Sequence, residues 1–139
     1  MVEAIKKYCQ KTGQPVPESV GELASVVYRS LAQSYGETVS GLEKIAGRTY
    51  DGIHIIGGGS NAAYLNQLTA DATGKTVYAG PGEATAIGNV MIQAMTVGEA
   101  TDVAGMRQLI SRSIPLKTYH PQDMAAWDAA YIHFKNCVR

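Results

Sequence analysis

Three consecutive glycines and a serine, residues 57–60, are the strongest candidates for ligand binding in this chain of 139 residues. They follow an apolar run at residues 53–56, and a helix is predicted at about residues 61–72, with Leu65, Leu68 and Ala72 facing inward and Gly74 at its end. Glycine tolerates positive φ and lets a ligand come close to the backbone. The helix that follows offers unpaired N–H groups and the positive end of its dipole. The pattern favours a site for a nucleotide or another anion; the alternative is a tight strand-to-helix turn that binds nothing.

The same glycines fit two other nucleotide motifs poorly. Gly57, Gly59 and Ala62 match the loose form of the dinucleotide fingerprint, with alanine in the third place. That fingerprint expects an acidic residue about 20 positions later, but no carboxylate follows the intervening strand until Glu83. No Gly-Lys pair follows at the distance that a phosphate loop of the GxxxxGK[ST] type requires. NAD or FAD binding therefore remains only a minor alternative.

A second glycine turn, residues 80–82, follows a second short predicted strand at residues 75–78. A long helix is predicted from residue 83 to about residue 97. The order strand, helix, strand, helix predicts parallel strands joined by a right-handed crossover. Both glycine turns then lie at the carboxyl edge of the sheet, where open α/β sheets bind ligands. Ala84 and Gly88 are one turn apart, and we expect them on a face that presses against the sheet.

Helices are predicted around this unit. Residues 2–12 form a helix that ends at Gly13. Ser19 is expected to cap the next helix, with Glu22 as the capping-box partner, and this helix is expected to break at Gly36. Its predicted buried stripe consists of Val20, Leu23, Val27, Leu31 and Tyr35. Two more helices are expected at roughly 102–112 and 122–136.

Two strands are too few for a self-sufficient α/β domain, because an average sheet has about five or six. Either the sequence contains strands that its pattern does not reveal, or the chain is part of a larger sheet. In the second case the chain exposes apolar surface and an unpaired strand edge. We then expect self-association or marginal stability of the isolated chain.

Composition excludes several classes of protein. Twelve basic and twelve acidic residues cancel, so the chain has no general attraction to nucleic acid or to an anionic membrane. Its two cysteines have no CxxC spacing, which favours a reduced, cytoplasmic compartment over a disulfide framework. The three histidines lack metal-ligand spacing, and Asp71, one turn after Gln67, is expected to order local structure. We expect neither a metal site nor a catalytic residue in this chain.

Residues 53–71, IHIIGGGSNAAYLNQLTAD, resemble the adenosine-side motif of the FGGY carbohydrate kinases. Three further stretches resemble the branch of that family that phosphorylates L-rhamnulose: residues 8–14 with Pro17, residues 30–32 with Tyr35, and residues 80–89. The resemblance covers residues 1–98 well and the tail loosely. The glycine turn alone would indicate only the wider superfamily.

This resemblance implies an actin-like ATPase fold of the ribonuclease-H-like class, α/β, with two domains. Residues 1–139 correspond to part of the C-terminal, nucleotide-side domain, helix-rich with a parallel β-α-β-α unit. The domain that holds the sugar, the first phosphate loop and the catalytic aspartate is absent from the chain. Such kinases transfer the γ-phosphoryl group of ATP, with Mg²⁺, to a ketose hydroxyl, here the 1-hydroxyl of L-rhamnulose. The chain alone is expected to be inactive.

The resemblance also implies the roles of individual residues. The ATP-contacting glycine of the family falls on Gly58. The family pattern has an asparagine where this chain has Ala62, whereas Asn61 lies one position earlier. The expected ATP-binding residues are Gly57, Gly58, Gly59, Ser60 and Asn61. Two alternatives stay open: another kinase of the family, acting on L-fuculose or xylulose, and a non-catalytic nucleotide-binding or regulatory module.

Overall fold

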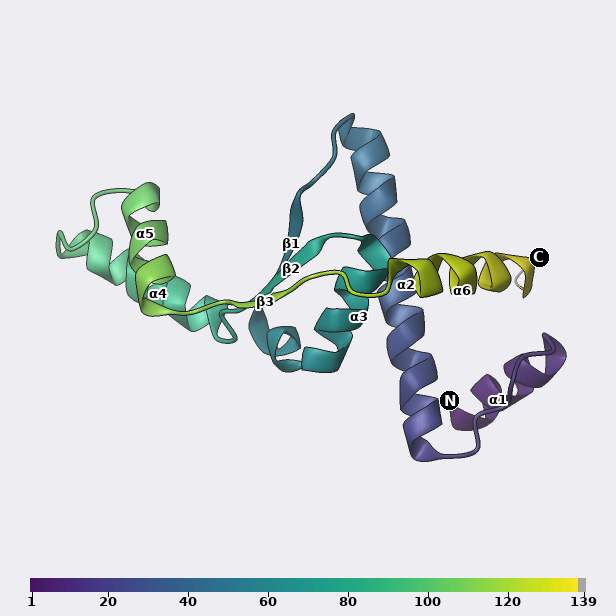
Figure 1. The fold of residues 1–139 in the computed structure, drawn as a ribbon. Coiled ribbons are helices and arrows are strands. Elements are labelled where there is room, and N and C mark those ends of the chain that lie inside the picture. The colour runs from purple at the N-terminus through teal and green to yellow at the C-terminus, as the bar shows by residue number, and fades with distance from the viewer. Residues whose placement is uncertain (138–139) are drawn as a thin grey trace.

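The computed structural model describes residues 1–137, and Figure 1 shows their arrangement. A small sheet lies at the centre, the long helix α2 stands beside it, and α4 and α5 extend away from it on the other side. In chain order the elements are α1 (Val2–Lys11), α2 (Val20–Ala46), β1 (Gly52–Ile55), the 3₁₀ helix η1 (Gly57–Asn61), α3 (Ala63–Thr73), β2 (Thr76–Ala79), α4 (Ala84–Thr96), α5 (Val103–Ser113), β3 (Lys117–Tyr119) and α6 (Met124–Cys137).

The sheet has the order β1-β2-β3. β1 and β2 are parallel, with Ile53 opposite Val77, which confirms the predicted crossover. β3 pairs with β2 in the antiparallel direction and was not predicted. Its three residues, Lys117 to Tyr119, are largely exposed and carry no apolar alternation, so only the pairing reveals this strand.

The crossover helix α3 begins later than predicted. Residues 57–61 form a 3₁₀ turn before it, and Gly74 ends the helix in the left-handed conformation, as expected. Of the three residues predicted to face inward, Leu65, Leu68 and Ala72, only Leu68 is buried. The most buried face of α3 consists instead of small and polar residues: Asn66, Thr69, Ala70 and Asp71.

The predicted buried stripe of α2 is wrong. Val20 is 84% exposed, and Leu31 and Tyr35 are each 38% exposed. Ala32 is the fully buried position. A side chain at Gly36 would begin 3.1 Å from the carbonyl oxygen of Ala72, so α3 packs directly against the α2 backbone here. α2 continues through Gly36 as one helix of 27 residues, so the predicted break is wrong. The glycine allows the close approach of α3 and does not interrupt the helix.

The helix-start prediction for α2 is confirmed, whereas the packing predicted for α4 is wrong. The Ser19 side chain accepts a hydrogen bond from the Glu22 N–H, and the Glu22 carboxylate accepts one from the Ser19 N–H. α4 contains no buried residue, and nothing lies within 4 Å of where a Gly88 Cβ would be. α4 projects away from the sheet (Figure 1), and Gly88 does not press against it.

The described residues leave much apolar surface uncovered. Tyr28, Leu42 and Ile45 on α2 are all exposed, and β1 has a strand partner on only one side within residues 1–137. These features match the expectation for part of a larger sheet. Among the described helices, none combines the length and the apolarity needed to cross a membrane.

Candidate functional site

The two glycine turns lie side by side at the carboxyl ends of β1 and β2. The Gly57 N–H donates to the Pro81 carbonyl at 2.9 Å, and the Gly80 N–H donates to the Ile55 carbonyl at 2.8 Å. A Cβ at Gly82 would lie 3.6 Å from the Asn61 side-chain amide. The prediction that both turns open on one edge of the sheet is therefore confirmed, and backbone hydrogen bonds join them directly.

The three glycines of the first turn are in different environments. Gly57 has a φ of +73°, a backbone conformation that residues other than glycine rarely adopt. Gly58 is exposed and has no positive φ, and no heavy atom lies within 4 Å of its missing Cβ. Glycine at position 57 is thus required by the backbone, whereas position 58 has open space above it. Such space over a bare backbone suits a flat ligand that stacks against the turn.

Ser60 has a structural role in the turn, whereas Asn61 lies at the surface. Ser60 is 5% exposed, and its hydroxyl donates to the Gly57 carbonyl at 2.7 Å, so it closes the 3₁₀ turn rather than facing a ligand. Asn61 is exposed and lies next to Gly82 of the second turn. Of the five predicted binding residues, Gly58, Gly59 and Asn61 are exposed, whereas Gly57 and Ser60 shape the turn.

One residue of the site escaped the sequence analysis. Asn66, on α3, is fully buried, and its side-chain N–H donates to the Ser60 carbonyl at 2.9 Å. A polar residue on the inward side of a helix was the available signal, but helical spacing alone assigned that side to Leu65 and Leu68. Asn66 thus connects the interior of the protein to the turn through this hydrogen bond.

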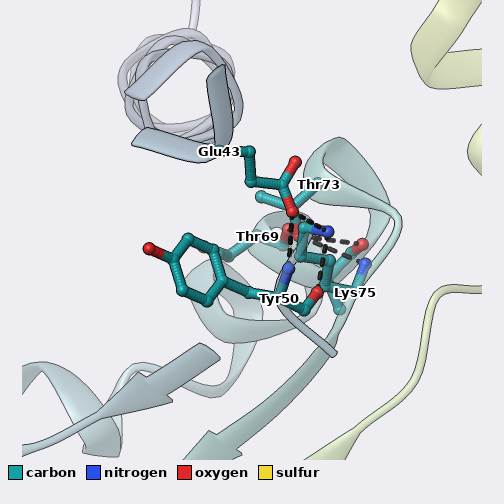
Figure 2. A network of polar contacts seen from close by, with 6 residues as sticks. Glu43, Tyr50, Thr69, Thr73 and Lys75 are labelled. Carbon is teal, nitrogen blue, oxygen red and sulfur yellow. Dashed lines mark hydrogen bonds and ion pairs between the residues drawn. The ribbon is translucent and has the colours of Figure 1, made fainter. Parts of the chain in front are cut away.

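The opposite, amino end of the β1–β2 pair is closed by a charged network (Figure 2). The Lys75 ammonium lies 2.7 Å from the Glu43 carboxylate and donates to the Tyr50 carbonyl at 2.8 Å. Glu43 also accepts the Tyr50 N–H at 2.8 Å. The hydrogen bond from Lys75, followed by that from the Tyr50 N–H, lowers the pKa of Glu43 below its usual value. This network ties α2 to the loops before β1 and β2.

Asp71 has the local role that was predicted for it. Its carboxylate accepts the Gln67 side-chain N–H at 3.0 Å and the Gln122 backbone N–H at 2.8 Å, which fastens the segment before α6 to α3. Within residues 1–137 no group of three His, Cys, Asp or Glu side chains could hold a metal ion. Glu83, beside the second turn, is exposed and makes no side-chain capping bond to α4.

Comparison with known proteins agrees with this geometry. Residues 3–97 match the C-terminal domain of the FGGY family of carbohydrate kinases. The described helix-rich unit with its small mixed sheet is accordingly part of that domain's actin-like ATPase-type fold.

Relatives with curated names agree as well. The chain is 67% identical over its whole length to a rhamnulokinase of Bacteroides thetaiotaomicron, 45% identical over 88% of its length to one of Ligilactobacillus salivarius, and 44% identical over 89% to one of Bacillus subtilis. It spans 29%, 25% and 26% of those proteins, respectively. With a family match over more than half of its residues and these relatives, the chain belongs to the FGGY family of carbohydrate kinases.

Proposed function

We propose that this chain forms the adenosine-binding side of an ATP-dependent kinase that phosphorylates L-rhamnulose at its 1-hydroxyl group. The observation that carries the proposal is the open glycine surface at Gly58, framed by two hydrogen-bonded turns at the carboxyl edge of parallel strands. Nucleotides bind at that edge in α/β proteins. The family match and the relatives named rhamnulokinase supply the reaction class and the sugar.

The described residues fit adenosine better than they fit a phosphate chain. The turn carries no lysine or arginine, and its exposed part consists of bare backbone and the Asn61 amide. Stacking over Gly58 and hydrogen bonds from Asn61 suit a base or a ribose. The phosphates, Mg²⁺ and the sugar would then be held mainly by the other domain of the kinase, in a cytoplasmic enzyme. Phosphoryl transfer depends on positioning and charge neutralisation, and this chain contributes the positioning of ATP.

A titration of the chain with ATP tests the binding half of the proposal. Backbone NMR spectra should show the largest ATP-dependent shifts at Gly57 to Asn61 and at the second turn, with adenosine reproducing most of them and inorganic triphosphate few. Shifts confined to another surface would contradict the proposed site. Weak affinity is expected, because one side of a cleft provides only part of the contacts.

A chimeric enzyme tests the reaction. The matching segment of the Bacteroides rhamnulokinase would be replaced by these 139 residues and assayed with ATP, Mg²⁺ and a panel of L-rhamnulose, L-fuculose and xylulose. Because the parent enzyme supplies most of the sugar contacts, the result that supports the proposal is turnover of L-rhamnulose with a KM for ATP close to that of the parent. A folded chimera that phosphorylates none of them would contradict it, and the chain alone should show no turnover because the catalytic base is expected in the other domain.

A further inference from the structure

We infer that Asn66 is a positioning residue that fixes the shape of the glycine turn so that Gly58 faces the nucleotide. This inference rests on the proposed adenosine site, although its structural half can be tested without any nucleotide. Asn66 lies on α3, behind the turn, and would not touch the ligand. Its effect would pass through the Ser60 carbonyl.

The contact has one possible polarity. The Asn66 side chain has no solvent exposure, and its Nδ2 lies 2.9 Å from the Ser60 carbonyl oxygen. A carbonyl oxygen only accepts hydrogen bonds, so the amide group must face it with its N–H. The bond joins residue 66 to residue 60 and thereby connects the helix interior to the end of the 3₁₀ turn.

Ser60 passes this restraint along the turn. Its hydroxyl donates to the Gly57 carbonyl at 2.7 Å, and the Gly57 N–H donates to the Pro81 carbonyl of the second turn at 2.9 Å. The turn is closed at its other end by the Ala62 N–H, which donates to the Gly59 carbonyl at 3.1 Å. The carbonyls of residues 57, 59 and 60 are all engaged by these bonds, and Gly58 is left at the outer surface.

Asn66 is a polar side chain in largely apolar surroundings. Its Oδ1 is buried and has no hydrogen-bond partner among the described residues. Asn66 also lines a cavity of about 270 Å³, with Ile53, Ile55 and Leu65 among its apolar neighbours. An unsatisfied buried acceptor is unfavourable in such surroundings, and leucine would fill the same space without it. A buried polar side chain that breaks this packing rule points to a role for its donor.

The first test measures hydrogen exchange in the chain without nucleotide. In Asn66→Leu, the Gly57 and Ala62 amides should exchange about fivefold to tenfold faster than in the wild type, since loss of one hydrogen bond changes a local equilibrium by about that factor. The melting temperature should change little, because the substitution leaves the Ser60 carbonyl without its donor but also removes the unpaired Oδ1 acceptor, and the two effects oppose each other. Thr69→Val is the matched control: Thr69 is equally buried, but its hydroxyl donates to Leu65 within α3. Equal protection of the turn in Asn66→Leu and wild type, or equal loss in both variants, would overturn the inference.

A second variant guards against misfolding of the first. Asn66→Asp keeps the shape of the side chain, but an ionised carboxylate cannot donate to Ser60, whereas the protonated acid can. Burial raises the pKa of such a carboxyl group. Relative to the wild type at each pH, protection of the Gly57 and Ala62 amides should be lost above the raised pKa of the new carboxyl group and recovered below it. Absence of any recovery in a folded variant would contradict the hydrogen-bond mechanism.

An ATP titration completes the test. Asn66→Leu should bind ATP about fivefold to tenfold more weakly than the wild type, and Thr69→Val should bind it normally. If the wild-type chain shows no ATP-dependent shift, the proposed adenosine site fails, and the exchange data alone decide whether Asn66 orders the turn. If the wild type binds and the loosened variant binds equally well, the adenosine site stands and the positioning role is overturned.

Discussion

The two ends of the β1–β2 pair are built in opposite ways. At the carboxyl end, hydrogen bonds between backbone groups join two glycine turns, and Gly58 is left bare at the surface. At the amino end, the side chains of Glu43 and Lys75 close over the Tyr50 backbone, with only 19% and 16% of their surfaces exposed. The first end uses backbone geometry to leave space, and the second uses charge to fill it.

This difference separates function from stability within one small sheet. Substitutions at the carboxyl end that respect the backbone should change ligand binding and leave unfolding unaffected. Substitutions at the amino end should change unfolding and leave ligand binding unaffected. Each prediction below tests that separation.

The largest effect is expected for Gly58→Val. No atom lies within 4 Å of the new Cβ and the φ of Gly58 is not positive, so the fold should tolerate valine, whereas the nucleotide should not. ATP binding should weaken by about 1–3 kcal/mol, the scale of overpacking at a tight site, or roughly fivefold to more than a hundredfold. NMR titration measures the affinity and thermal melting provides the control. A folded variant with normal ATP affinity would move the site away from Gly58.

Gly57→Ala should act on the fold as well. The positive φ of Gly57 costs a residue with a Cβ about 1–2 kcal/mol, so the free energy of unfolding measured with urea should fall by about that amount. Gly58→Ala is the matched control, with no such strain. Comparable stability of the two alanine variants would show that the turn relaxes easily.

Lys75→Met should lower the melting temperature by several degrees without changing ATP affinity. Methionine keeps most of the side-chain bulk but leaves the Glu43 carboxylate and the Tyr50 carbonyl without their donor, and unpaired polar groups in a half-buried position are unfavourable. Differential scanning calorimetry and the ATP titration measure the two properties. A clear loss of ATP affinity would mean that the two ends of the sheet are coupled.

The same network should make stability depend on pH. Because Lys75 and the Tyr50 N–H lower the pKa of Glu43 in the folded chain, its stabilising effect is complete above the ordinary pKa of 4.5 and is lost as the pH falls through the lowered value. The free energy of unfolding measured with urea should fall more on acidification for the wild type than for Glu43→Gln. The pKa of Glu22 is also lowered, by the Glu18 and Ser19 N–H groups, but this carboxylate is present in both proteins. Parallel pH profiles would exclude Glu43 as a contributor.

Asn61→Ala should have the smallest effect. Asn61 is exposed and lies beside Gly82, one position before the asparagine of the family pattern. ATP affinity should fall by less than about 1.4 kcal/mol, that is, less than tenfold, and stability should not change. If Asn61→Ala abolishes binding while Gly58→Val does not, the asparagine rather than the glycine is the anchor of the site.

The sequence by itself determined the features that depend on local chemistry. Gly74 ends α3 and Ser19 starts α2 because left-handed backbone and capping bonds involve only nearby residues. The order of strands and helices in residues 52–96 was sufficient to predict parallel pairing and adjacent glycine turns. The family resemblance then predicted that residues 57–61 bind ATP.

Only the tertiary structure decided what depends on neighbours far along the chain. Helical spacing located an apolar face on α2, but the buried position is Ala32, and the Ala72 carbonyl packs closely against Gly36. β3 forms because it pairs with the edge of β2, and Lys75 forms an ion pair with Glu43, 32 positions earlier in the sequence. Asn66 is a short-range case that periodicity also missed: its side-chain N–H donates to the carbonyl of Ser60, six positions earlier, in the 3₁₀ turn before α3. Periodicity shows which residues can share a face, and packing decides what that face meets.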